Sequence, residues 1–143
     1  MKTIITLILS LIMLKGCSQK DIQDTTITYV ATTRGFYQKI TIKNQEISIN
    51  KNRNDEGLGE TRKIADNDWN ELVNLFSKID LENFSSYEGP TKKRQYDGAA
   101  FANITIHYQD KDYENASFDH GYPPVEIQDF VNKVVDLSKN DKE

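Results

Sequence analysis

The sequence predicts a small α+β domain in which a four-stranded, mainly antiparallel sheet carries two helices on one face. Two kinds of periodicity lead to this prediction. Apolar and polar side chains alternate within 26–50 and 98–119, which is typical of half-buried strands. Apolar residues recur every three or four positions within 69–79 and 127–134, which is typical of amphipathic helices. Since two strands precede each helix, we expect two ββα units.

The first half of the chain is expected to contain two strands followed by a loop. Alternation predicts strands at 26–32 and 36–43, joined by a turn at 33–35. At 44–45 we expect a turn or a bulge, after which the second strand continues to residue 50. Segment 51–62 contains two glycines and many charged residues, so we interpret it as a loop.

The first helix is predicted from one apolar stripe and from acidic residues at its start. The stripe consists of Trp69, Leu72, Val73, Phe76 and Ile79. Asp66 and Asp68 could accept hydrogen bonds from the first helical amides. Asp68 and Glu71 also have the spacing of a capping box.

The second half begins with a long loop, 85–97, and such loops are often functional. A strand is expected from residue 98, followed by a turn at 109–112 and a return strand at 113–119. Pro123-Pro124 then favours the start of the last helix. The face of the sheet away from the helices is expected to be polar, and it would carry Tyr37, Lys39, Thr41, Asn103, Thr105 and His107.

Residues 1–17 have the pattern of an export signal. An apolar run at 4–14 follows Lys2, and it is shorter than the roughly 20 residues that span a bilayer. It ends in Leu14-Lys15-Gly16-Cys17, which resembles the lipobox of bacterial lipoproteins, and Cys17 is the only cysteine. The resemblance implies that residues 1–16 are a lipoprotein signal peptide and that Cys17 is lipidated, so that the protein contacts the membrane through its lipid.

The rest of the chain is then divided into a polar tether at 17–25, a single α+β domain at 26–139 and a frayed tail at 140–143. The residue after Cys17 is not aspartate, so the usual signal for inner-membrane retention is missing. Gln19-Lys20-Asp21 is similar to the surface-export signal of Bacteroidota lipoproteins. We therefore expect a lipid-anchored protein of the cell envelope, at the outer membrane, on its periplasmic face or at the cell surface.

Composition limits the classes of function. The net charge of −4 disfavours binding to nucleic acid. No His-Glu-x-x-His, Gly-x-Ser-x-Gly or glycine-rich phosphate loop is present, so we predict no catalytic residue, no metal site and no cofactor. The two histidines would need carboxylates to complete a zinc site.

One corner of the predicted sheet gathers the candidate binding residues. If the second hairpin closes at 109–112, residue 100 lies opposite residue 121. The loop before the third strand and the start of the last helix then meet at one end of the sheet. The residues that could converge there are Arg94, Tyr96, Asp97, Asp119, His120 and Tyr122. The same residues could equally form a structural, salt-bridged corner.

Several stretches resemble known families. Gly35-Phe36, Asp66-Asn67-Asp68-Trp69, Tyr96-Asp97-Gly98-Ala99 and the segment 118–124 resemble a family of small, uncharacterised Bacteroidota lipoproteins. The order of elements, Arg34-Gly35-Phe36 and Asp97-Gly98 are similar to emfourin-type inhibitors of thermolysin-like metalloproteases. Asp24-Thr25-Thr26 resembles the short O-glycosylation sequence of Bacteroidota envelope proteins.

These observations favour a non-enzymatic, lipid-anchored binding module whose partner is an envelope protein or glycan. The resemblance to emfourins implies an alternative, a protease inhibitor. A third hypothesis is a small hydrolase that uses His120 with Asp97 or Asp119, since histidine and carboxylate pairs serve acid–base chemistry.

Overall fold

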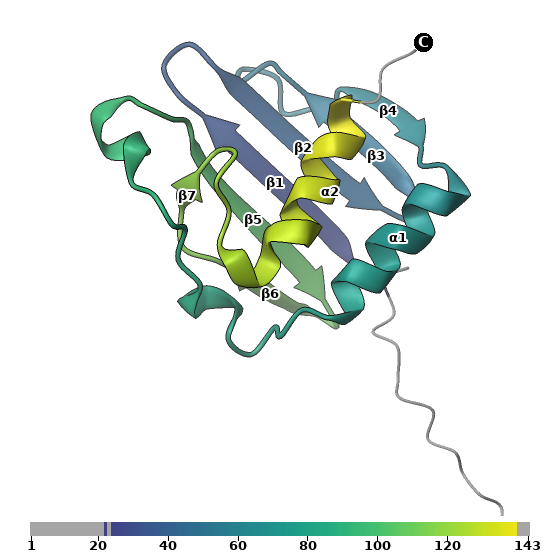
Figure 1. Cartoon of the computed structure of the whole chain (residues 1–143). Helices are drawn as coiled ribbons and strands as arrows, with labels where there is room; N and C mark the ends of the chain where they lie inside the picture. The colour runs from purple at the N-terminus through teal and green to yellow at the C-terminus, as the bar shows by residue number, and fades with distance from the viewer. Residues whose placement is uncertain (1–21, 23, 140–143) are drawn as a thin grey trace, which may run out of the picture.

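The structure is a computed structural model, and it describes residue 22 and residues 24–139. It has the predicted α+β class, with two α-helices and one antiparallel sheet. The sheet has seven strands rather than four, so the expected pair of ββα units is wrong in detail. Figure 1 shows the sheet with both helices lying across the same face.

The strands follow the order β4-β3-β2-β1-β5-β6, and β7 also pairs with β5. Every pairing between named strands is antiparallel. Because β6 and β7 both lie along β5, they form one interrupted edge of the sheet. The strands are β1 (Thr26–Thr32), β2 (Tyr37–Lys43), β3 (Glu46–Asn50), β4 (Glu60–Lys63), β5 (Phe101–Tyr108), β6 (Lys111–Glu114) and β7 (Phe118–Asp119).

Two of the additional strands lie in the first half of the chain. Asn44 and Gln45 have φ angles of 52° and 63°, which close a two-residue hairpin, so that β2 and β3 are separate strands. β4 begins within 51–62, the segment expected to be a loop, and ends one residue beyond it. It pairs with β3 although it has no apolar stripe, and the hydroxyls of Ser48 and Thr61 are 2.9 Å apart across this pair.

The third difference is a break in the predicted return strand. Ile106 pairs with Tyr113 and Ala102 pairs with Phe118, so one extra residue separates the two registers. Asn115 lies at this bulge, where its backbone N–H donates to the carbonyl of Ile104 and its side-chain oxygen accepts from the Ile104 N–H at 3.0 Å. The same offset places Ala100 opposite His120 rather than opposite residue 121, as the hydrogen bond from His120 N–H to the Ala100 carbonyl shows.

The helices are α1 (Asp66–Ser77) and α2 (Gln128–Lys139), and the latter follows a short 3-10 turn at Val125–Ile127. The predicted stripe of α1 faces the core, where Leu72 and Phe76 are fully buried. Phe76 packs edge-on to Tyr108 and also meets Phe130 of α2. The core therefore lies between the two helices and one face of the sheet.

The predicted caps of α1 have other partners. Its N-cap is Ala65, and no side chain there hydrogen-bonds the first amides. Asp66 instead accepts a hydrogen bond from Gln45 at 2.7 Å. Asp68 and Glu71 do not form a capping box, because both accept from Lys133 of α2 at 2.7 Å. Tertiary contacts with the β2–β3 turn and with α2 have replaced local capping.

The folded part begins earlier than predicted. Ile22 belongs to the hydrophobic core, and Thr25 is also buried. The Thr25 N–H donates to the Ile22 carbonyl at 3.1 Å. Within the expected tether of 17–25, these residues are thus part of the domain, while 17–21 and 23 lie outside the described residues. The tail predicted at 140–143 lies outside them too.

Candidate functional site

A long loop crosses the edge of the sheet where the binding corner was predicted. It leaves the layer of the helices after Phe84–Ser86, passes beside β7 and enters β5 (Figure 1). A Cβ atom on Gly89 would lie 2.7 Å from the Cβ of Phe118 and 3.2 Å from the Tyr122 carbonyl oxygen. Only glycine therefore allows the loop to pass this close to β7.

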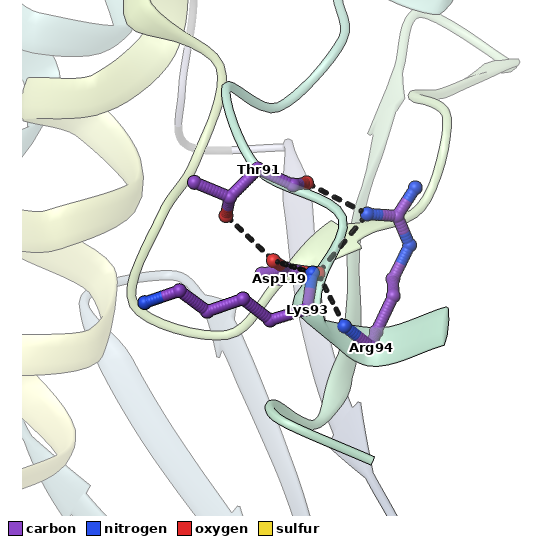
Figure 2. Close-up of polar contacts among 4 residues, drawn as sticks. All are labelled: Thr91, Lys93, Arg94 and Asp119. Carbon is purple, nitrogen blue, oxygen red and sulfur yellow. Dashed lines mark hydrogen bonds and ion pairs between the residues drawn. The ribbon is translucent and has the colours of Figure 1, made fainter. Parts of the chain in front are cut away.

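Asp119 holds the loop in place (Figure 2). Its carboxylate is fully buried and accepts four hydrogen bonds. One oxygen accepts from the Thr91 hydroxyl at 2.5 Å and from the Lys93 backbone N–H at 2.6 Å. The other accepts from the backbone N–H and from the guanidinium of Arg94, both at 3.0 Å. The carboxylate is thus enclosed by its own chain and cannot reach a ligand.

The same contacts keep Asp119 charged. Burial alone would raise the pKa of its carboxyl group. The hydrogen bonds from Thr91, Arg94 and Lys93 outweigh burial and hold that pKa well below its usual range. Arg94 also forms an ion pair with Asp119 at 3.0 Å and donates to the Thr91 carbonyl. Asp119 is therefore a buried anion that joins a loop to a strand.

Tyr122 extends this structure toward solvent. Gly121 has a φ of +91°, and the Tyr122 N–H donates to the Asp119 carbonyl at 2.8 Å, which closes a tight turn after β7. The ammonium of Lys93 lies 4.3 Å from the centre of the Tyr122 ring and donates to its hydroxyl at 3.2 Å. Tyr122 is thus held against the loop while part of its ring stays exposed.

His120 points to the opposite face of the sheet from Asp119, because successive residues of a strand alternate. Its Nδ1 atom is 2.6 Å from the hydroxyl of Tyr29, and its ring packs between Tyr29 and Phe36. Burial lowers the pKa of His120, and the positive charge of Lys139 lowers it further. Burial also raises the pKa of the Tyr29 hydroxyl. The pair is therefore neutral near pH 7.

Tyr96 and Asp97 lie at the exposed end of the loop. Asp97 has a φ of 59°, and the following residue, Gly98, donates its N–H to the Lys93 carbonyl at 2.8 Å. Asp97 is exposed, and within residues 24–139 its carboxylate has no hydrogen bond or ion pair to the other corner residues. Its conformation ends the 3-10 turn Lys93–Tyr96 and leaves the Tyr96 ring in solvent.

The six predicted residues therefore do not converge on one site. Arg94 and Asp119 are paired, and Tyr122 joins them through Lys93. His120 lies on the other face, and its ring nitrogen bonds to Tyr29 rather than to a carboxylate. The pairing of His120 with Asp97 or Asp119, which a hydrolase would need, is not formed.

A hollow of about 380 Å³ lies at the same end of the sheet and was not predicted. We call it the basic hollow, and 34–37 and 51–54 line it. The hairpin between β1 and β2 and the end of β3 meet here because adjacent antiparallel strands bring alternate turns to one end. The sequence does show the three basic residues Arg34, Lys51 and Arg53. Their proximity could be predicted only if β3 were recognised as a separate strand that ends beside the β1–β2 turn.

Two sites of covalent modification were also predicted, an O-glycosylation sequence at 24–26 and lipidation of Cys17. Thr25, which lies within the predicted O-glycosylation sequence 24–26, is 1% exposed, so its side chain is not accessible to a glycan in the folded domain. Cys17, the predicted site of lipidation, lies outside the described residues.

Within the described part, no group of three or more His, Cys, Asp or Glu residues is arranged to hold a metal ion. Neither described helix has the length and apolarity to cross a membrane.

No protein-family model, curated protein or solved structure matches the chain significantly. The resemblances to Bacteroidota lipoproteins and to emfourins rest on short motifs, and they stay predictions.

Proposed function

We propose that the protein is a lipid-anchored envelope lipoprotein whose folded domain is a non-enzymatic binding module. Lipid on Cys17 would hold it at the outer membrane, and its partner would be an envelope protein or glycan. The partner would contact the end of the sheet opposite the start of β1. We call this end the distal end, and it comprises the β1–β2 turn, the 51–59 loop, the 91–100 loop with the first residue of β5, and the turn after β7.

The clustering of exposed aromatic rings at the distal end carries this proposal. Four of the large exposed hydrophobic residues in the described part are aromatic, and all four lie there. They are Phe36, Tyr96, Phe101 and Tyr122, with exposed fractions of 41%, 72%, 48% and 44%. Aromatic residues and arginine are enriched in protein interfaces, whereas a folded domain usually buries its rings.

The scaffold beneath these rings is preorganised. Asp119 fixes the loop that carries Tyr96, and Lys93 holds Tyr122 against that loop. His120 packs behind Phe36 at 5.6 Å between ring centres. A surface whose side chains are already ordered loses less conformational entropy on binding. Of the residues first expected to bind, Arg94, Asp119 and His120 thus support the exposed rings from behind, whereas Tyr96 and Tyr122 are two of those rings.

The alternatives gain no support from the described residues. His120 has Tyr29 as its partner, so the hydrolase lacks its acid–base pair. The emfourin hypothesis rests on the order of elements, and the seven strands depart from the ββαββα order on which it was based.

Site-specific photo-crosslinking in cells tests the proposal. A photoreactive phenylalanine analogue replaces Tyr96 in the full chain, and a matched variant carries it at His107, an exposed position at the other end of the sheet. We expect a defined adduct from position 96 and none from position 107. Equal labelling from the two positions, or none from position 96, would contradict a binding surface at the distal end.

A further inference from the structure

The basic hollow, lined by 34–37 and 51–54, is a cationic part of an acidic chain. Arg34, Lys51 and Arg53 line it, and no acidic side chain does. None of these three cations forms an ion pair among the described residues. The whole chain has a net charge of −4, so this local excess of positive charge stands out. An anionic group would find complementary charge here.

Arg53 connects the two segments that line the hollow. Its guanidinium donates to the Thr32 hydroxyl at 2.8 Å, to the Phe36 carbonyl at 3.2 Å and to the Thr33 carbonyl. It also lies 5.9 Å from the centre of the Tyr37 ring. These contacts tie the 51–59 loop to the β1–β2 turn, so the two walls of the hollow are held together.

Asn50 orders the 51–59 loop, which forms one side of the hollow. It is buried, and its side-chain amide donates to the carbonyls of Asp55 and Gly57 at 2.7 and 2.9 Å. Its side-chain oxygen accepts the N–H of Asn52 at 2.7 Å. The side-chain oxygen of Asn52 in turn accepts the N–H of Asn54. The loop is thus shaped by its own hydrogen bonds, and Asn52 and Asn54 are among the residues that line the hollow.

The backbone at the hollow has little capacity to pair with a peptide strand. The Thr33 and Phe36 carbonyls already accept from Arg53, and the Thr33 N–H donates to the Phe36 carbonyl at 2.8 Å. A peptide that binds by adding a strand needs such groups free. This favours recognition by the side chains that line the hollow, which are cations, neutral amides and one exposed ring.

We propose that the basic hollow binds an acidic oligosaccharide whose sugars carry carboxylate groups. Arg34 and Lys51 would bind the carboxylates, since charge-assisted hydrogen bonds are the strongest of their kind. Asn52 and Asn54 would bind sugar hydroxyls, and the exposed ring of Phe36 would pack against the apolar face of a sugar. This inference rests on the proposed binding function, and it names the class of partner.

Binding of a uronic-acid tetrasaccharide to the full chain in detergent tests the inference. Arg34→Gln combined with Lys51→Gln removes two exposed cations that form no ion pair among the described residues. Lys43→Gln with Lys63→Gln is the matched control, because both lysines are exposed, without ion pairs, and at the other end of the sheet. By isothermal titration we expect at least about a tenfold loss of affinity in the first variant and none in the control.

Three results would overturn the inference: no binding of the tetrasaccharide by the natural chain, equal binding by both variants, or tighter binding of an oligoglutamate peptide of the same charge. A neutral oligosaccharide of the same length serves as the negative control. Photo-crosslinking from position 96 does not depend on the hollow's charges. A failed titration with successful crosslinking would therefore remove the acidic glycan and leave the binding module.

Discussion

Asp119 shows how one side chain organises a surface without contacting a ligand. Four donors surround its carboxylate, and all four come from three residues of the loop that it holds, Thr91, Lys93 and Arg94. Because the group is buried, its loss leaves the Thr91 hydroxyl and two backbone N–H groups without an acceptor, and it leaves the guanidinium of Arg94 without its ion-pair partner. The exposed Tyr96 owes its position to this buried anion.

We expect Asp119→Asn to lower the free energy of unfolding by about 2–4 kcal/mol, since the amide cannot accept from all four donors and breaks an ion pair. Asp97→Asn is the control, because that carboxylate is exposed, and it should change stability by less than about 0.5 kcal/mol. Chemical denaturation measures both. Similar losses in the two variants would contradict the structural role assigned to Asp119.

The acid dependence of stability should also change in Asp119→Asn. The pKa of Asp119 is lowered on folding, so its contribution is present above the ordinary value near 3.8 and is lost as pH falls through the lower folded value. The variant has no such contribution. Its unfolding free energy should therefore fall less steeply than that of the natural chain below about pH 4.

His120 should cause a second pH dependence of the unfolding free energy, in a higher pH range than that of Asp119. Its pKa is lowered on folding, so the unfolded chain binds the proton more tightly, and stability falls as pH drops below the ordinary value of 6.5. Titration of the imidazole by NMR should give a midpoint below 6.5. In His120→Asn, the unfolding free energy should no longer fall as the pH drops from 6.5 to that midpoint. A midpoint at or above 6.5 would contradict the burial of His120 against Tyr29 and Phe36.

At the scale of elements, two hairpin turns with positive φ angles close without the glycine that is usual in such turns. Asn44 and Gln45 close the β2–β3 turn, and Gln109 and Asp110 close the β5–β6 turn, all with positive φ. Glycine adopts this conformation without the steric cost that other residues have. The two turns differ in what their second residue contacts, which allows a direct comparison.

We expect Asp110→Gly to raise the free energy of unfolding by about 0.5–1 kcal/mol, because it relieves that cost. Gln45→Gly should give no gain, because Gln45 donates hydrogen bonds to the Ile64 carbonyl at 3.0 Å and to Asp66 at 2.7 Å. Thermal and chemical denaturation of both variants checks this. Destabilisation by Asp110→Gly would show that its side chain has a partner of its own.

The same elements explain which strands sequence reasoning missed. A hairpin signal is strongest for Asn-Gly or Asp-Gly, and Asn44-Gln45 lacks the glycine, so one long strand was expected. β4 has no apolar alternation, and its pairing depends on β3 and on the contact of Arg62 with the Leu137 carbonyl at the end of α2. Such a strand forms because the edge of a neighbouring strand is available for pairing. The sequence of the strand itself does not indicate that such an edge is present.

At the scale of the whole molecule, the buried Ile22 places the domain close to the proposed anchor. Only residues 18–21 separate Cys17 from it, which limits the link to about 17 Å even if fully extended. β1 begins at the end of the sheet that carries the turns at 44–45 and 109–110. That end would face the membrane, and the basic hollow and the exposed rings would face away from it.

Cys17→Ser tests the anchor. We expect the natural chain in the membrane fraction, with an intact mass increased by acyl groups, because two or more acyl chains hold a protein stably in a bilayer. The variant should retain its signal peptide or leave the membrane fraction, and it should carry no acyl mass. Ser18→Ala is the matched control and should behave like the natural chain. Unchanged mass and fractionation in Cys17→Ser would exclude lipidation at this residue.

The sequence by itself determined the fold class, the faces of the main strands and the stripe of α1. These follow from periodicity, because burial on one side of a strand or helix imposes a local repeat. Only the tertiary structure decided the number of strands, the separation of Asp119 from His120 and the meeting of the 34–37 and 51–54 segments. The reason is physical: each depends on register and on partners distant in the chain, such as Tyr29 for His120 and Thr91 for Asp119.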